Sequence, residues 1–266
     1  MAVSAPLDFL PFALQLAQVA RGETLPRWRT GCASEDKGGT ADYDPVTDAD
    51  REAERAMRAL IEAQYPEHGV AGEEFPDRPA QGPWCWSLDP VDGTRSFTCG
   101  LPNWVTLIAL LHEGKPVLGI IDAPALDELY AGCGDLSLLR QAGRDSAARV
   151  SDCRDIGEAR FSTTDPYLFT GAAEADAFET LRRKARTMRY GHDGYGYARL
   201  AAGTLDLVVE TGLKPHDYNA LIPVVRAAGG VIGDWRGGED FSAGRVIAAA
   251  TRALFAQAVR VMERAS

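Results

Sequence analysis

The sequence predicts an α/β protein in which helices and antiparallel strands form the first half and strands alternate with helices in the second. Two β-type runs, Val105 to Leu111 and Pro116 to Ile121, are joined by HEGK, which is typical of an antiparallel hairpin. Beyond residue 155, apolar strand-like runs alternate with helical stretches, which favours an α/β layer. The 266 residues are 45% hydrophobic and 25% charged, so one large domain or two smaller ones sharing a cleft is expected.

The first half is predicted to begin with two helices and a mobile connection between them. Leu7 to Ala20 has helical spacing, and Asp8 with no positive leading region favours a helix over a signal peptide. Arg21 to Tyr43 is rich in Gly, Thr and charge, so we expect a mobile connection. Thr47 opens a second helix to about Gln64, whose apolar face consists of Ala53, Ala56, Met57, Leu60 and Ile61.

Residues 134–155 are polar and rich in turn residues, which predicts a seam between two parts of the chain, 1–150 and 151–266. The second part should carry the α/β layer. Its expected elements are a helix near Ala172–Ala185, a buried strand over Leu205–Val209, a helix from about Asp217 to Ala228, a short strand, and a last helix from Thr251 to Arg264.

Composition excludes several classes of function. The net charge of −10 argues against a nucleic-acid binder, and it disfavours a phosphate site unless metal ions reverse the local field. No apolar run approaches the roughly 20 residues that cross a bilayer, so no membrane partner is expected. The five cysteines include no CxxC pair, which disfavours a disulfide framework or zinc site and favours a cytoplasmic setting.

Acidic residues with possible chemistry occur at four separated places. Glu73 and Glu74 follow Gly72 in a loop, Asp217 begins a predicted helix, and Asp50 lies in DPVTDAD. Singly, each has an ordinary structural explanation. Asp50 completes a capping box with Thr47, Asp217 suits a helix N-terminus, and GEE suits a solvated loop.

The fourth place, WSLDPVDGT, favours a functional interpretation. Asp89 emerges where the apolar run WCWSL ends, and Asp92 follows three residues later across Pro90, which stiffens the backbone. The carbonyl of Val91, between the acids, would add an oxygen on the same side. Two carboxylates and a carbonyl on one turn, completed by a distant Glu and Asp, suit a hard cation such as Mg²⁺.

Three motifs in this order, GEE, DPVDGTRSF and KPHDYNALIPVVRAAGG, resemble the inositol-monophosphatase superfamily of Mg²⁺-dependent, lithium-sensitive phosphatases. The resemblance spans roughly Asp36 to Gly233. It implies a layered αβαβα sandwich of the inositol-monophosphatase/fructose-bisphosphatase type, a small phosphate monoester as substrate, and a homodimer. One departure is Lys214-Pro215-His216 before Asp217, where many relatives carry an aromatic residue beside the Asp.

Carried over residue by residue, the resemblance implies a site for two or three Mg²⁺ ions. Glu73, Asp89 and the Val91 carbonyl would hold the first, and Asp89, Asp92 and Asp217 the second. Glu73 would also contact a weaker third ion.

The resemblance also implies roles around the phosphate. Asp50 and Thr94 match the pair that orients the attacking water, and Gly93 and Thr94 would offer backbone N–H groups. No Ser or Cys has the setting of a nucleophile, so direct attack by water activated at the metal is the expected mechanism.

DGTRSF, LIALLHEGKPVLGIIDAP and LKPHDYNALIPVV look most like the histidinol-phosphate phosphatases of the superfamily. That branch implies hydrolysis of L-histidinol phosphate to L-histidinol and phosphate, in histidine biosynthesis. An inositol-1-phosphate or broad sugar-phosphate phosphatase is the alternative. A catalytically inactive regulatory or scaffold member is a third, disfavoured because every metal and water-orienting position carries a competent residue.

Substrate choice is expected to depend on acids of the second half. Asp193 and Glu210 match the region that holds the leaving alcohol, and acids suit the cationic groups of histidinol. Glu210 alone does not discriminate, because the inositol enzymes have a Glu at this spacing. Asp193 is equally well explained as a turn residue. Tyr195 and Tyr197 either line the pocket or fill the core, with the core favoured, and Arg95 is expected to be structural or at the rim.

Overall fold

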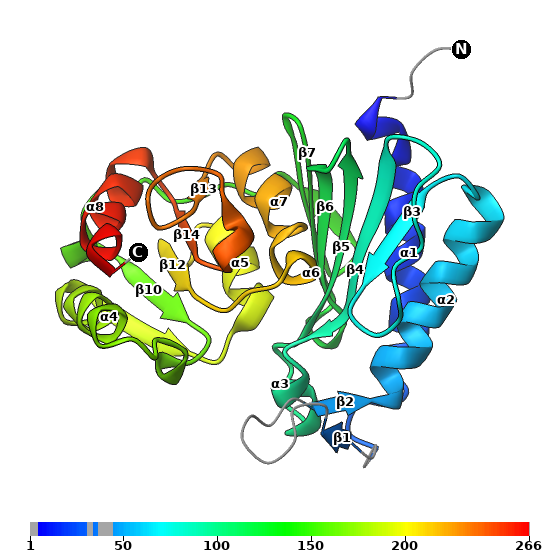
Figure 1. The fold of residues 1–266 in the computed structure, drawn as a ribbon, viewed down its shortest axis with the longest axis horizontal. Coiled ribbons are helices and arrows are strands. Elements are labelled where there is room, and N and C mark those ends of the chain that lie inside the picture. Colours follow the sequence, from blue (N-terminus) through cyan, green and yellow to red (C-terminus); the bar gives the residue numbers. More distant parts are fainter. Residues whose placement is uncertain (1–4, 31–33, 37–44, 266) are drawn as a thin grey trace.

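The part of the chain described in this computed structural model, residues 5–30, 34–36 and 45–265, forms five stacked layers (Figure 1). Helices α1 (Leu10–Thr24) and α2 (Asp48–Gln64) form one outer layer, and α4 (Ala172–Lys184) and α8 (Arg252–Met262) form the other. Between them lie a seven-stranded sheet, a layer with α5 (Asp193–Ala201) and α7 (Leu221–Ala227), and a five-stranded sheet. The predicted αβαβα class is confirmed.

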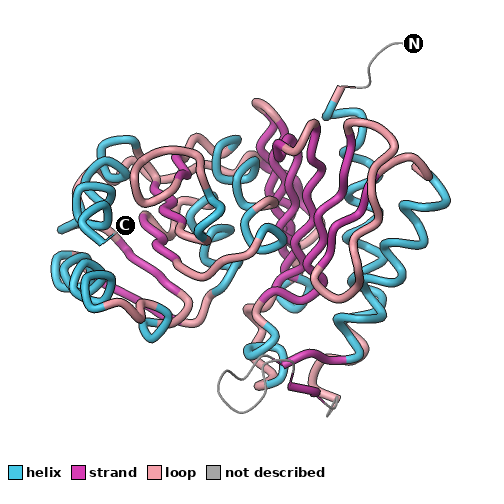
Figure 2. Tube along the Cα trace, in the orientation of Figure 1, coloured by secondary structure: helices cyan, strands magenta, loops and turns pink. Residues whose placement is uncertain are grey.

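The seven-stranded sheet runs in the order β3-β4-β5-β6-β7-β8-β9 and is antiparallel except for the β3–β4 pair. Figure 2 shows its strands in magenta between two layers of helices. Side chains alternate along its strands, so Leu107 and Ala109 pack toward α5 and α7 while Ile108 and Leu110 pack toward α1 and α2. The predicted hairpin is confirmed. The strands are β3 (Gly69–Gly72), β4 (Trp84–Asp92), β5 (Val105–His112), β6 (Lys115–Ala123), β7 (Glu128–Cys133), β8 (Leu136–Gln141) and β9 (Arg144–Ser146).

Helix α1 extends past the predicted end at Ala20. The Arg21 guanidinium donates two hydrogen bonds to the buried Asp122 carboxylate, at 2.8 and 2.7 Å, and this contact holds the last turn of α1 on the sheet. The connection therefore does not begin at Arg21, as predicted, because α1 continues to Thr24 and turns follow to residue 30. Its mobility stays a prediction. The rest of the predicted connection, up to Tyr43, includes strand β1 (Ser34–Asp36), which pairs with β2 (Pro45–Thr47). Residues 31–33 and 37–44 lie outside the described residues.

The five-stranded sheet has the order β11-β10-β12-β14-β13, with β10 parallel to β11 and β12. The predicted strand near residues 205–209 is β12 (Leu207–Glu210). The sequence patterns predict none of the strands β10, β11 and β14. The others are β10 (Arg160–Thr163), β11 (Thr187–Tyr190), β13 (Val231–Gly233) and β14 (Val246–Ala249).

Two predictions for the helices of the second half need correction. The helix expected from Asp217 to Ala228 is two pieces, α6 (Pro215–Tyr218) and α7, because Pro223 has no N–H to bond to the Asn219 carbonyl one turn earlier. The stretch GHDGYGYARLAAG contains helix α5, which the sequence patterns do not predict. The glycines Gly119 and Gly132 of the sheet let this layer approach closely, since a Cβ on either would overlap the backbone of Ala220 or Pro223.

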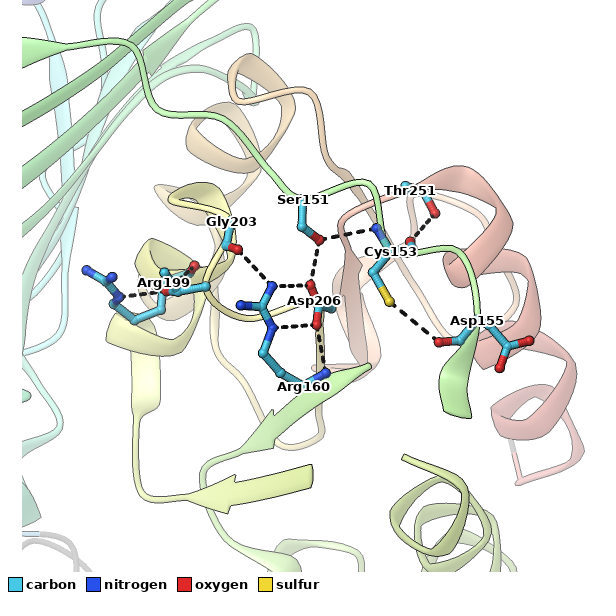
Figure 3. Close-up of polar contacts among 9 residues, drawn as sticks. Ser151, Cys153, Asp155, Arg160, Arg199, Gly203, Asp206 and Thr251 are labelled. Atoms are coloured by element: carbon cyan, nitrogen blue, oxygen red, sulfur yellow. Dashed lines mark hydrogen bonds and ion pairs between the residues drawn. The ribbon is translucent and has the colours of Figure 1, made fainter. Parts of the chain in front are cut away.

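The predicted seam at 134–155 is partly sheet, because β8 and β9 fall inside it. Only the residues after β9, from 147 to 155, connect the two halves. The division of the chain between residues 150 and 151 stays our proposal. Figure 3 shows how this connection is attached to the second half. The Asp206 carboxylate accepts hydrogen bonds from the Ser151 hydroxyl and from the Arg160 backbone N–H and guanidinium, while Thr251 donates to the Cys153 carbonyl at 2.7 Å.

We expect Asp206→Asn to lower the free energy of unfolding by about 1–2 kcal/mol near neutral pH, because an amide cannot accept all of these bonds. Burial alone would raise the pKa of Asp206, but the bonds from Arg160 and Ser151 outweigh it and hold the pKa below its usual value. The stabilisation is therefore present above the unfolded pKa, about 3.9, and disappears as the pH falls through the folded one.

Urea unfolding of both proteins from neutral to acid pH measures this difference. Asp152→Asn, at an exposed acid on the same segment, is the control and should match the wild type. A gap that stays constant down to strongly acid pH would contradict the role of the ionised carboxylate.

No helix among the described residues is long and apolar enough to cross a membrane. The cytoplasmic setting stays a prediction.

Candidate metal and phosphate site

Strand β4 carries the two acids of DPVD at an irregularity in the sheet. The strand does not end at Asp89, as expected, but continues to Asp92. Asp89 pairs with Leu107 and Asp92 with Val105, so β4 contains one extra residue there. Such a bulge changes the direction of side chains and tolerates Pro90, whose carbonyl accepts a 2.7 Å hydrogen bond from Thr106.

The bulge brings both acids to a third carboxylate from the other half of the chain. Oxygen atoms of Asp89, Asp92 and Asp217 lie within 4.8 Å of one another. Asp217 is held at the start of α6, where its Oδ2 accepts the Lys214 N–H at 2.6 Å. Asp92 also links the halves, because its Oδ2 accepts the Gly194 N–H at 2.6 Å.

The charges of this cluster oppose one another. Burial raises the pKa of Asp89, and Glu73 and Asp92 raise it further. Burial raises the pKa of Asp92, with further contributions from Asp193 and Asp217. Burial also raises the pKa of Asp217, and the charge of His216 partly offsets this rise. Neutralisation by a cation would relieve this repulsion, and an all-oxygen donor set suits Mg²⁺, so the residues fit such an ion.

The cluster faces a cavity of about 530 Å³ between the two halves. All but one of the predicted site residues line it, namely Glu73, Asp89, Val91, Asp92, Gly93, Thr94, Asp193, Glu210 and Asp217. Arg95 lies at the same cavity as an exposed charge, 3.8 Å from Asp165. A larger hollow of about 760 Å³ between α4 and α8 contains none of the predicted site residues.

Asp50 does not line the cavity but lies directly behind Thr94. Its Oδ2 accepts the Thr47 N–H at 3.0 Å, which confirms the capping box, and its Oδ1 lies 3.4 Å from the Thr94 hydroxyl. That hydroxyl also lies 3.0 Å from the Val91 carbonyl, and its single proton serves one acceptor at a time. Burial raises the pKa of Asp50 to about 6. The structure therefore brings together both residues of the predicted water-orienting pair.

The loop that presents Glu73 is fixed by a residue that the sequence did not single out. Glu54 on α2 is fully buried, and its carboxylate accepts the Glu74 N–H at 2.8 Å and the Arg58 Nε–H at 2.7 Å. Arg58 also donates to the Phe75 carbonyl. Gly72 is required here, because a Cβ would overlap the Glu54 carboxylate.

Asp193 and Glu210 form a second acidic group in the cavity. Asp193 begins α5 with a left-handed φ of 48°, and its carboxylate lies beside Gly93. Glu210, at the end of β12, accepts bonds from the Thr164 N–H at 2.8 Å and the Thr163 hydroxyl at 3.1 Å. Burial raises the pKa of Asp193 to about 6 and, with the charge of Asp193, that of Glu210 to about 8.

These positions bear on the open alternatives. Asp193 begins α5 and lines the cavity, and its role in substrate choice stays a prediction. Tyr195 points away from the cavity, with its hydroxyl 3.2 Å from Glu128. Tyr197 was expected either to line the pocket or to fill the core, and it does both, since it is buried in the core and lines the cavity. No sequence pattern points to Thr163 and Thr164, which meet Glu210 because β10 lies beside β12 in the sheet.

The protein is an α/β sandwich, and the cavity between its two halves is lined by carboxylates that suit a metal cation. The chain belongs to the inositol monophosphatase family, because a model of that family matches residues 7–266.

Similar proteins carry several names. A chloroplastic bifunctional phosphatase of Arabidopsis thaliana is 44% identical over 74% of this chain and 56% of that protein. A histidinol-phosphatase of Chlorobaculum parvum is 34% identical over 92% of this chain and 93% of that protein. An inositol-1-monophosphatase of Rhizobium meliloti is 33% identical over 79% of each. The structure of an inositol monophosphatase from Zymomonas mobilis is 40% identical, covers 98% of this chain and 100% of that chain, and gives a TM-score of 0.84.

Proposed function

We propose that the protein is a Mg²⁺-dependent phosphate monoester hydrolase and that its substrate is L-histidinol phosphate. One observation carries the proposal: a single cavity contains the carboxylate cluster of Asp89, Asp92 and Asp217 and, beside it, the separate acids Asp193 and Glu210. The first group suits cations that bind a phosphate. The second suits the positively charged amine of an amino alcohol.

The metal would be held by oxygen atoms of this chain. Under the proposal, Glu73, Asp89 and the Val91 carbonyl hold one ion, Asp89, Asp92 and Asp217 hold another, and Glu73 contacts a weaker third. When bound, such ions neutralise phosphate charge and lower the pKa of a coordinated water.

The chain itself orients the reactants. The Thr94 hydroxyl holds the water that attacks phosphorus, and Asp50 behind it orients that hydroxyl. The raised pKa of Asp50 makes it a suitable acceptor, through Thr94, of the water's proton near neutral pH. Backbone N–H groups of Gly93 and Thr94 bind phosphate oxygens. As the bond from the water oxygen to phosphorus forms, the bond from phosphorus to the alcohol oxygen breaks. One proton of the attacking water passes to Asp50, and the released alkoxide takes its proton from solvent water, which Asp50 then resupplies.

The inositol-1-phosphate alternative has support of its own. The relatives from Rhizobium meliloti and Zymomonas mobilis are named inositol monophosphatases, and they cover most of this chain. The histidinol-phosphatase name of the Chlorobaculum parvum relative and the pair of acids beside the metal cluster favour the cationic alcohol. A homodimer and a role in histidine biosynthesis belong to the same proposal.

The test is phosphate release from purified protein with Mg²⁺, comparing L-histidinol phosphate with inositol 1-phosphate at matched concentrations. Preference for histidinol phosphate supports the proposal. Comparable rates would retain the metal mechanism but reject the substrate. No release from either, together with no Mg²⁺ binding by calorimetry, would favour the regulatory or scaffold member.

We expect Asp193→Asn to raise KM for histidinol phosphate about 10- to 100-fold at about pH 8, where the wild-type carboxylate is ionised. The KM for inositol 1-phosphate, the ester of an uncharged alcohol, should rise much less, because that alcohol carries no positive charge for Asp193 to bind. Asn tolerates the left-handed φ of this position, so the backbone is retained.

Asp127→Asn is the matched control, because Asp127 is an exposed acid that also has a left-handed φ, of 52°. It should leave both KM values unchanged. Equal losses on the two esters in Asp193→Asn would contradict a role in selecting the cationic alcohol.

A further inference from the structure

One buried hydroxyl at the site has no hydrogen-bond partner. Among the described residues, four buried side-chain polar atoms lack a partner, and only the Tyr197 hydroxyl belongs to a residue that lines the site cavity. The other three are Trp28 Nε1, Arg78 Nε and Trp104 Nε1. Buried polar groups in proteins are nearly always hydrogen-bonded, so an exception at a binding cavity points to a partner that arrives with the ligand.

The position of Tyr197 places it at the floor of the cavity. It lies on α5, four residues after Asp193, and therefore on the same helix face one turn later. Its side chain is only 1% exposed and packs in the core between the two sheets. Burial raises the pKa of its hydroxyl, and the charges of Glu210, Asp92 and Asp217 raise it further. All three of these acids line the same cavity as Tyr197.

Neighbouring tyrosines differ in this respect. The Tyr130 hydroxyl donates to Glu128 at 2.8 Å, and the Tyr195 hydroxyl donates to the same carboxylate at 3.2 Å. Both hydroxyls are therefore satisfied within the free protein. Tyr197 keeps a polar atom where phenylalanine would fill the same space at no loss of hydrogen bonding.

We propose that the Tyr197 hydroxyl is a polar contact of the substrate, on the side of the cavity that holds the leaving alcohol. The inference rests on the proposed phosphatase function and adds a residue to its specificity pocket. The hydroxyl would hydrogen-bond to a polar group of the alcohol, next to Asp193 and Glu210. A phosphate ester whose alcohol has no amine or hydroxyl near this point would not use the contact.

The experiment compares Tyr197→Phe with Tyr195→Phe on L-histidinol phosphate and on p-nitrophenyl phosphate, whose leaving group lacks an amine. Loss of one hydrogen bond should raise KM of Tyr197→Phe for histidinol phosphate about five- to tenfold, and by clearly less for p-nitrophenyl phosphate. Tyr195→Phe, which removes a hydroxyl remote from the cavity, should leave both KM values at the wild-type level.

Two further measurements separate this role from a structural one. Thermal unfolding without ligand should give Tyr197→Phe a Tm no lower than that of the wild type, because no bond is lost in the free protein. Tyr195→Phe should instead lower Tm. Calorimetric Mg²⁺ affinity should match the wild type in both variants.

Several outcomes would overturn the inference. An unchanged KM for histidinol phosphate, an equal rise on both esters, or weakened Mg²⁺ binding in Tyr197→Phe would each assign the hydroxyl elsewhere. The wild type reports on the function separately. If it releases phosphate from neither ester, the proposed function and this inference both fail. If it is active and only the Tyr197→Phe result disagrees, the function stands and the contact is rejected.

Discussion

Replacing Asp92 by Asn is expected to lower kcat/KM for phosphate release by about a thousandfold or more and to leave the protein folded. Asp92 is one of three carboxylates whose oxygens lie within 4.8 Å of one another, so its charge is central to holding a cation. Cation stabilisation of transition-state charge contributes several kcal/mol, and about 4 kcal/mol corresponds to a thousandfold change in rate. The Asn oxygen can still accept the Gly194 N–H that joins the two halves.

The same substitution should alter stability in a way that depends on metal. Burial and the charges of Asp193 and Asp217 raise the pKa of Asp92, which means that its charged form is held at a cost in the metal-free protein. Asp92→Asn should therefore raise Tm by a few degrees without Mg²⁺. Added Mg²⁺ should stabilise the wild type more than the variant, because ligands stabilise the state that binds them.

Phosphate release, Mg²⁺ calorimetry and thermal unfolding measure these effects together. Asp135→Asn, at an exposed acid in the turn between β7 and β8, is the control and should match the wild type. If Asp92→Asn kept a tenth or more of wild-type activity with normal Mg²⁺ affinity, the carboxylate cluster would not be the metal site.

Gly72→Ala is expected to be the second large effect, although Gly72 itself carries no functional group. The added Cβ would overlap the buried Glu54 carboxylate, which accepts the Glu74 N–H. Overpacking of this kind destabilises by about 1–3 kcal/mol. The loop that presents Glu73 would shift with it, and we expect Mg²⁺ affinity to fall about 10- to 100-fold, as when residues that support metal ligands are changed.

Gly82→Ala is a matched control for this substitution. A Cβ at Gly82 meets nothing within 4 Å, so the variant should bind Mg²⁺ and unfold like the wild type. Urea unfolding and calorimetry distinguish the two variants. Normal Mg²⁺ affinity in Gly72→Ala would mean that Glu54 stabilises the fold without positioning the metal-binding loop.

Features that depend on neighbouring residues were predictable from the sequence. The capping box of Thr47 and Asp50 was predicted from a spacing of three, and the structure has it. The β5–β6 hairpin was predicted from two apolar runs around HEGK. Hydrogen bonds within one turn or one hairpin involve few residues, so a short segment specifies them whatever surrounds it.

Features that depend on distant partners were predicted wrongly or missed. The end of α1 depends on the contact of Arg21 with Asp122 on β6, about a hundred residues away in sequence, and no local pattern revealed it. Strand β14 is defined by its pairing with β12 and β13, which bracket it in space and not in sequence. The role of Glu54 requires α2 to lie against the loop after β3, a contact between helix and loop that only packing creates.

The candidate site divides in the same way. By itself the sequence determined the local donors, because Asp89, Pro90 and Asp92 share one short segment and the GEE and KPHD motifs carry their acids explicitly. Only the tertiary structure decided that Asp217 meets Asp92, that Asp193 lies beside Gly93, and that the Tyr197 hydroxyl is buried without a partner. Those distances are set by the packing of one half of the sandwich against the other, and packing depends on many weak contacts that no single motif contains.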